Sequence, residues 1–398
     1  MASRLRGKSA RPREAHVPTG RDTQAAHAAA YFALLCVGLY STSFGPALPV
    51  IARRAAVDLD TAGLIFTALF AGSISASSLV ATRLRRRDPG SLSTAGLILV
   101  SAGLATIGVA STWPVVLASS LLLGAGDGLI VAAGHTLIAE TAEDVTAGLS
   151  RLNIYFAFGA IAGPLWAGAV LELWDSVPVL YIGIAVVTLA AAGMMFATGR
   201  GIPVRRAPPQ GAATGRLSRL VLRMGLLLFL YVGAEFGLGS WVASYSEDAV
   251  GAGMFEGAAV TSLYWGALAI GRIVSGQLFA RGASAQRVLL IALAGALVSS
   301  GVLVATTGSF AFAAAAAFAT GLCFGPIWAC AMAIAADGGE RQVPAAMVTI
   351  GNAGGLLFPW LQGAVLVSGS ATAGIAVTWV LCAAMLAVAA VSVRHHGG

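Results

Sequence analysis

Two acidic residues, Asp127 and Glu235, lie in the middle of apolar runs that are long enough to cross a membrane as helices. An ionised acid at the centre of a bilayer costs about 2.5–3.5 kcal/mol on insertion scales, and acids in such positions are functional by default. A carboxyl group that faces a water-filled cavity at this depth can bind and release a proton. We therefore expect both acids to couple proton movement. The alternative is that each fixes helix packing through hydrogen bonds.

Basic partners for these acids are scarce in the same runs. Arg272 is expected toward the cytoplasmic end of its run, and His135 lies eight residues after Asp127. That spacing is about 12 Å along one helix, which is beyond direct contact. The sequence therefore predicts isolated acids. His135 is a weaker candidate for a proton relay, because a lone histidine in a span is often a hydrogen-bonded packing residue.

Aromatic and amide side chains supply candidate contacts for a solute. Phenol and indole groups suit a sugar-like molecule, because they offer an apolar face together with a hydrogen-bond donor. The candidate solute-binding residues are Tyr40, Tyr231, Trp328 and Asn352. Tyr40 corresponds to Glu235 at an offset of 195 residues. For the aromatic residues, helix packing or an interfacial belt is an equally good interpretation.

The composition requires an integral membrane protein. Of the 398 residues, 58% are hydrophobic and 10% are charged, and the mean hydropathy is +0.84. Soluble domains carry about a quarter charged residues. The net charge of +7 comes from basic residues that fall between the apolar runs. This placement indicates a lipid bilayer as partner and argues against nucleic acid.

Enzyme and cofactor signatures are missing from the sequence. The four cysteines lie inside apolar runs, where packing is favoured over a disulfide or a zinc site. No nucleophile elbow, phosphate-binding loop or dinucleotide fingerprint occurs. We expect a protein that is not an enzyme and that holds neither a cofactor nor a metal.

Twelve apolar runs predict twelve spanning helices, since each is close to the 20 or so residues that a bilayer requires. They lie near 28–52, 61–82, 92–112, 114–139, 150–173, 177–198, 220–246, 258–279, 287–308, 310–336, 344–368 and 372–393. Apolar residues do not alternate in these runs as they would in a barrel strand. The predicted fold class is an all-α membrane protein.

Basic residues predict the topology. With the N-terminus in the cytoplasm, 22 of the 24 Lys and Arg residues fall on the cytoplasmic side, and Arg53 and Arg54 fall outside. The expected parts are a cytoplasmic tail (1–27), a six-helix bundle (28–198), an Arg-rich cytoplasmic linker (199–223), a second six-helix bundle (224–393) and a cytoplasmic tail (394–398). We expect a multi-pass protein of the plasma (inner) membrane with an uncleaved first span and both termini cytoplasmic.

The two halves resemble each other at a nearly fixed offset. Pro164 is followed by Gly168-Ala-Val-Leu, and Pro359 is followed by Gly363-Ala-Val-Leu, an offset of 195. Val37-Gly38 and Val232-Gly233 match at the same offset. Two repeated halves of six helices are typical of transporters that rock about a central solute site.

The whole chain from about 28 to 393 resembles the major facilitator superfamily. The segment from Tyr231 to Trp241, YVGAEFGLGSW, looks like a motif of its fucose:proton symporter-like branch. Gly271-Arg272 and the segment from Gly354 to Trp360 fit the same branch. The resemblance implies two six-helix pseudo-repeat bundles, a monomer, and a small-molecule solute and protons as partners.

Other segments depart from that branch. The loop that follows the second span lacks the glycine and the aspartate that the superfamily usually has there. The segment from Gly159 to Gly168 is close to a motif of drug:proton antiporters. Small residues at this spacing let two helices touch, and a proline bends one of them. The residues expected to serve helix packing or gating are Gly159, Gly163, Pro164, Arg272 and Pro359.

These features favour a secondary active transporter that moves a small polar solute, such as a sugar, by proton-coupled alternating access. A proton-coupled exporter of drugs or metabolites is the alternative, and a channel or sensor comes third. Export of amphiphiles predicts a wide apolar pocket around Asp127 and Glu235. Sugars predict clustered amides and hydroxyls there.

Overall fold

The computed structural model describes residues 20–84, 86–202, 218–306, 308–336 and 343–394. Residues 1–19 of the expected tail, most of the expected linker and residues 395–398 lie outside these ranges. Within them, twelve helical spans are long and apolar enough to cross a membrane, which confirms the all-α prediction. No strand occurs in the described part of the chain.

The first six spans contain seven α-helices and one short π-helix, η1. Their bounds are α1 Gly20–Ala55, α2 Leu59–Ala62, α3 Leu64–Leu79, η1 Val80–Leu84, α4 Pro89–Val109, α5 Trp113–Thr141, α6 Val145–Trp174 and α7 Val177–Thr198. The last six spans are α8 Arg219–Val250, α9 Met254–Ala280, α10 Ala285–Ala305, α11 Phe310–Phe324 with α12 Ile327–Ala336, α13 Val343–Ser368 and α14 Ala371–Arg394. We call these two sets the N-terminal bundle and the C-terminal bundle. Pro326 separates α11 from α12, so the tenth span is broken where one continuous helix was expected.

Polar residues in the loops set where several helices begin. The side chains of Asp88 and Asp144 accept hydrogen bonds from the free backbone amides at the starts of α4 and α6. Ser176 and Ser218 do the same for α7 and α8. Such caps satisfy donors that the first helical turn leaves unpaired, so the helices begin at defined residues.

Glycines bring the long helices of each bundle into contact. A Cβ atom at Gly38 of α1 would lie 2.1 Å from the carbonyl oxygen of Phe156 in α6, and one at Gly159 would lie 2.0 Å from that of Leu35. The C-terminal bundle repeats this arrangement between α8 and α13, where a Cβ at Gly354 would lie 1.8 Å from the carbonyl oxygen of Phe229. Gly159 and Gly354 are 195 residues apart, so glycines at equivalent positions of the internal repeat seat a close helix crossing in each bundle.

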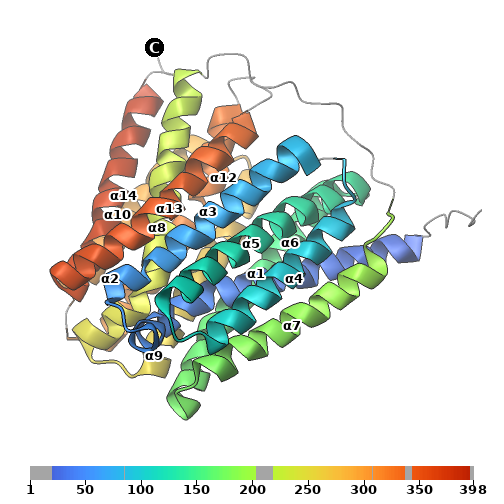
Figure 1. The fold of residues 1–398 in the computed structure, drawn as a ribbon. Coiled ribbons are helices and arrows are strands. Elements are labelled where there is room, and N and C mark those ends of the chain that lie inside the picture. The colour runs from blue at the N-terminus through green and yellow to red at the C-terminus, as the bar shows by residue number, and fades with distance from the viewer. Residues whose placement is uncertain (1–19, 85, 203–217, 307, 337–342, 395–398) are drawn as a thin grey trace, which may run out of the picture.

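The two bundles meet chiefly through the pairs α6–α9 and α3–α13. Figure 1 shows the blue α3 and the orange α13 running side by side, although they are far apart in the sequence. The ring of Phe70 in α3 contacts the ring of Phe236 in α8 across the interface between the bundles, with centroids 4.9 Å apart.

We call the membrane side on which α1 begins the N-terminal side, and the side on which α1 ends the far side.

Candidate functional site

Asp127 lies at mid-depth in the N-terminal bundle, fourteen residues from either end of α5. Its carboxylate accepts hydrogen bonds from the hydroxyls of Tyr40 in α1 at 2.6 Å and Ser73 in α3 at 2.7 Å. Tyr40 is buried, and Asp127 is partly exposed. Three spans therefore converge on one acid.

Small residues on α5 explain how Ser73 reaches Asp127. A Cβ at Gly124 would lie 2.1 Å from the carbonyl oxygen of Leu69, and one at Gly128 would lie 2.3 Å from that of Ser73. With no side chain at these two positions, the backbone of α3 lies directly against α5 on either side of Asp127. The glycines thus place the serine hydroxyl within hydrogen-bonding distance.

Glu235 lies at mid-depth in the C-terminal bundle, near the centre of α8. Its Oε1 is 2.9 Å from Nη2 of Arg272 in α9, so the two form an ion pair. The expectation of an isolated acid at this position was wrong. Side chains of a helix lean toward its N-terminus, and α9 begins on the far side. The Cα atom of Arg272 lies in the half of the membrane toward the N-terminal side, and its side chain therefore extends back to mid-depth.

The two members of this pair differ in exposure. The side chain of Glu235 is 4% exposed and that of Arg272 is 35% exposed. Arg272 is thus the more accessible member of the pair. The backbone that carries it is fixed, because a Cβ at Gly271 would lie 2.2 Å from the carbonyl oxygen of Leu322 in α11.

Aromatic residues surround the ion pair. Tyr264 donates a hydrogen bond to the backbone carbonyl of Glu235 at 2.9 Å. The hydroxyl of Tyr231 is buried beside Glu235 and Arg272. The ring of Trp328 lies 6.4 Å from the ring of Tyr231. Predicted residues from α8, α9 and the tenth span are therefore close together.

Other predicted residues lie apart from the two acids. His135 is within 2.8 Å of the carbonyl of Val131 through Nδ1, a contact inside its own helix. Asn352 is partly buried on α13. Between described residues, no hydrogen bond or ion pair links His135 or Asn352 to either acid.

The prolines and glycines expected to serve packing lie at helix crossings. A Cβ at Gly163 would lie 2.2 Å from the carbonyl oxygen of Leu39, which seats α6 on α1 next to the proline at 164. The carbonyl of Pro359 accepts a hydrogen bond from the indole of Trp241 at 2.7 Å, which joins α13 to α8.

Sequence reasoning missed Ser73, and it assigned Arg272 to packing or gating without its ion pair. A usable signal was present for Ser73. It lies four residues before Ser77 in an apolar run, so both hydroxyls fall on one helix face. In the structure Ser77 also faces α5 and donates to the carbonyl of Gly128 at 3.3 Å.

The arrangement leaves an electrostatic imbalance at mid-depth. Glu235 is compensated by Arg272. Asp127 is held by two hydroxyls, and no described Lys or Arg forms an ion pair with it. An ionised Asp127 therefore carries a negative charge that a proton would neutralise at low cost.

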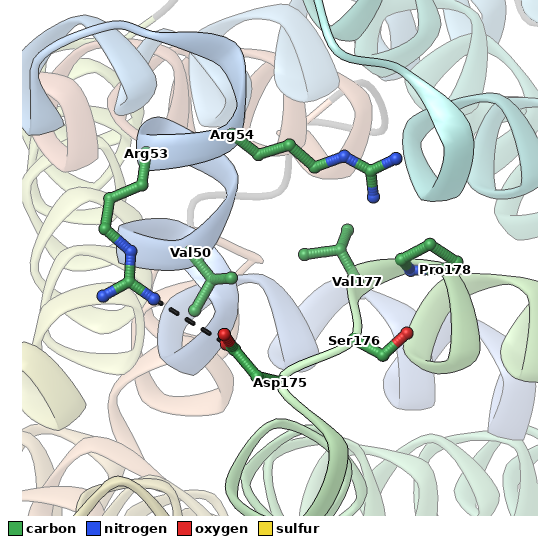
Figure 2. Close-up of a pocket in the computed structure, with 7 residues that line it drawn as sticks. All are labelled: Val50, Arg53, Arg54, Asp175, Ser176, Val177 and Pro178. Atoms are coloured by element: carbon green, nitrogen blue, oxygen red, sulfur yellow. Dashed lines mark ion pairs between the residues drawn. The ribbon is translucent and has the colours of Figure 1, made fainter.

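A separate pocket of about 410 Å³ lies at the far side of the N-terminal bundle. Figure 2 shows Arg53 and Asp175 facing each other across it, with side-chain nitrogen and oxygen atoms 3.8 Å apart. Arg54 donates hydrogen bonds to the carbonyls of Gly108 and Val109 at the end of α4. This pocket is at the end of the spans, away from the mid-depth acids.

Comparison with known proteins agrees with this architecture. Residues 30–359 match the family model of the Major Facilitator Superfamily. The mouse (Mus musculus) "Sodium-dependent glucose transporter 1A" is 24% identical over 277 residues. That match covers 60% of this chain and 65% of the mouse protein, so it spans less than two thirds of the relative.

Two similar solved structures come from a bacterial homologue of the human lysosomal transporter Spinster, in inward-facing unoccupied and occupied conformations. Their TM-scores are 0.72 and 0.74 at 12% identity, and each match covers 94% of this chain and 96% of the other. This likeness concerns the fold. Because the family model covers most of the chain, this multi-pass membrane protein belongs to the Major Facilitator Superfamily and is a transporter rather than an enzyme.

Proposed function

We propose that the protein moves a small polar solute, such as a sugar, across the membrane by proton-coupled alternating access. Asp127 is the coupling site, and Arg272 is the group of the C-terminal bundle that the solute meets first. The observation that carries the proposal is the unequal compensation of the two acids. Glu235 has a cation at 2.9 Å, whereas the carboxylate of Asp127 is held by two hydroxyls.

A proton is favoured over a metal ion by the donor set around Asp127. A hard cation that is held by protein groups takes about six or more oxygen ligands. The described hydrogen-bonding partners of this carboxylate are two hydroxyl groups, both placed as donors. Protonation requires no further ligands. The name of the mouse relative makes sodium the alternative ion to test.

The solute class follows from the polar and aromatic groups near the acids. Tyr231 and Trp328 form an aromatic pair beside the Glu235–Arg272 ion pair. The buried phenol of Tyr231 and the partly exposed side chain of Arg272 supply donors for hydroxyl groups. The name of the mouse relative and the motif from Tyr231 to Trp241 also favour a sugar as the solute.

Export of a drug or metabolite is the second candidate. The segment from Gly159 to Gly168, which is close to an antiporter motif, takes part in the contact between the bundles. A Cβ at Gly168 would lie 2.6 Å from the Cβ of Ala258 in α9. The segment therefore contributes to the surface that must move during transport.

We further propose a monomer in the plasma membrane with both termini in the cytoplasm. Arg53 and Arg54 are the described basic residues on the far side, and most others lie on the N-terminal side. Asp127 and Arg272 are partly exposed at mid-depth, whereas hydrogen bonds join the bundles nearer the far side. This combination fits a cavity that is open to the cytoplasm.

Proteoliposomes test the proposal directly. The purified protein is reconstituted, and uptake of labelled sugars and of cationic drugs is measured under a proton gradient, a sodium gradient or neither. We expect a sugar to accumulate under the proton gradient. This accumulation should be lost when a protonophore is added. Accumulation driven by the sodium gradient would show that the coupling ion is sodium and not a proton. Drug movement against the direction of proton flow would support export.

A further inference from the structure

Two hydroxyl groups bind the bundles to each other at equivalent places. Thr67 of α3 donates from Oγ1 to the carbonyl oxygen of Leu356 in α13 at 2.8 Å. Ser262 of α9 donates from Oγ to the carbonyl oxygen of Ile161 in α6, also at 2.8 Å. Each bond joins one bundle to the other, and the two bonds run in opposite directions.

The internal repeat relates these two bonds. Thr67 and Ser262 are 195 residues apart, and so are Ile161 and Leu356. This is the offset that relates Pro164 to Pro359. Both acceptor carbonyls lie three residues before the proline of their helix. The interface is thus built from one contact that occurs twice, with a hydroxyl retained at both donor positions.

The prolines open the helix turn to which these acceptor carbonyls belong. A proline in a helix interior has no N–H, which frees the carbonyl four residues earlier and opens that turn. In α6 the freed carbonyl is that of Ala160, and Thr42 of α1 donates to it at 3.1 Å. The next carbonyl of the same turn, at Ile161, receives Ser262. A carbonyl oxygen has two lone pairs, so it can accept a side-chain donor beside a helical one.

Both bonds lie between mid-depth and the far side. Thr67 is eight residues after the far-side start of the second span, and Ser262 is eight residues after the start of α9. A third bond between the bundles, from the Phe255 amide to Glu172 at 2.8 Å, lies at the far end itself. Rocking the bundles to open the far side must therefore break both hydroxyl bonds.

We propose that Thr67 and Ser262 form a symmetric pair of latches that stabilises the conformation closed on the far side. Each latch is a hydroxyl that docks on the proline-opened turn of the opposite bundle. Loss of either hydroxyl shifts the equilibrium toward the conformation open on the far side. The inference depends on the architecture and not on the identity of the solute or of the coupling ion.

Spin-label distances across the far side test this. Ser111 and Ser370 are exposed residues in far-side loops of the two bundles, and both are changed to cysteine in a chain whose half-buried Cys323 is replaced by alanine. Double electron–electron resonance in nanodiscs then gives the ratio of long to short distances. We expect Thr67→Val and Ser262→Ala each to raise this ratio about threefold, the effect of an average hydrogen bond between membrane helices.

Three control variants separate a latch from general loosening. Thr67→Ser and Ser262→Thr keep the hydroxyl and should keep the wild-type ratio. Thr42→Val removes a bond to the opened turn of α6 within one bundle, so it should leave the ratio unchanged. Melting temperatures show which variants are folded, and the distance ratio is compared among the folded ones.

Several results would overturn the proposal. An unchanged ratio in Thr67→Val and Ser262→Ala would show that the hydroxyls do not hold the interface. A change of the ratio in one of these variants but not in the other would show that the two hydroxyl bonds do not act as a pair. An equal shift in Thr42→Val would show that any lost hydroxyl near the proline has the same effect.

Discussion

At the scale of residues, the two mid-depth acids differ in what holds them. Glu235 is buried against a guanidinium, while Asp127 is bound by the hydroxyls of Tyr40 and Ser73. An ion pair in a low-dielectric region keeps both charges, because removing either one leaves the other unpaired. An acid that receives hydroxyl bonds can exist with or without its proton, since hydroxyl groups serve as donors and as acceptors.

Removing one member of the ion pair should destabilise the protein more than removing both. Glu235→Gln leaves Arg272 without its counter-charge, and we expect a loss on the order of 2 kcal/mol, below the value for fully buried pairs because the arginine is partly exposed. Glu235→Gln combined with Arg272→Gln should recover part of that loss. Melting temperatures in detergent measure both. A double variant as unstable as the sum of the two single variants would contradict this account.

At the scale of elements, small residues decide how the helices meet. The crossing of α1 with α6 and that of α8 with α13 depend on glycines at equivalent positions of the repeat. Side chains there would enter the backbone of the neighbouring helix, so packing and the position of Tyr40 on α1 are linked. The polar site is therefore placed by residues that carry no chemistry themselves.

Gly159→Ala tests this dependence. The added methyl would lie 2.0 Å from the carbonyl oxygen of Leu35, so the helices must separate. We expect a loss on the order of 2 kcal/mol or more, seen as a lower melting temperature. Gly193→Ala in α7 is the matched control, because nothing lies within 4 Å of its added methyl. It should be neutral or slightly stabilising. Equal losses in the two variants would contradict the packing argument.

Much of the helix arrangement was predictable from the sequence. Apolar run length predicted the spans, and the repeat of Pro164 and Pro359 predicted the equivalence of the halves. The Glu235–Arg272 contact was not predictable from run position, because it depends on the length and tilt of one side chain. Ser73 was missed because a serine in a span usually bonds its own helix, and here the absence of side chains at Gly124 and Gly128 moves it next to Asp127.

At the scale of the whole molecule, each bundle contributes one mid-depth acid, and only the acid of the C-terminal bundle is in an ion pair among the described residues. The interface has hydrogen bonds and aromatic contacts between mid-depth and the far side, and the acids lie next to it. Rocking about such an interface exposes a central site to one side at a time. An acid whose charge must be neutralised before the bundles close again would link that motion to a proton.

The most direct measurement compares accumulation with exchange in the Asp127→Asn variant. In proteoliposomes with a proton gradient, we expect this variant to lose concentrative uptake of the transported solute and to keep counterflow, the exchange of labelled for unlabelled solute. An amide imitates the protonated acid but cannot release a proton, so the bundles still rock while coupling is lost. Wild-type accumulation by Asp127→Asn would contradict the assignment of Asp127 as the coupling site.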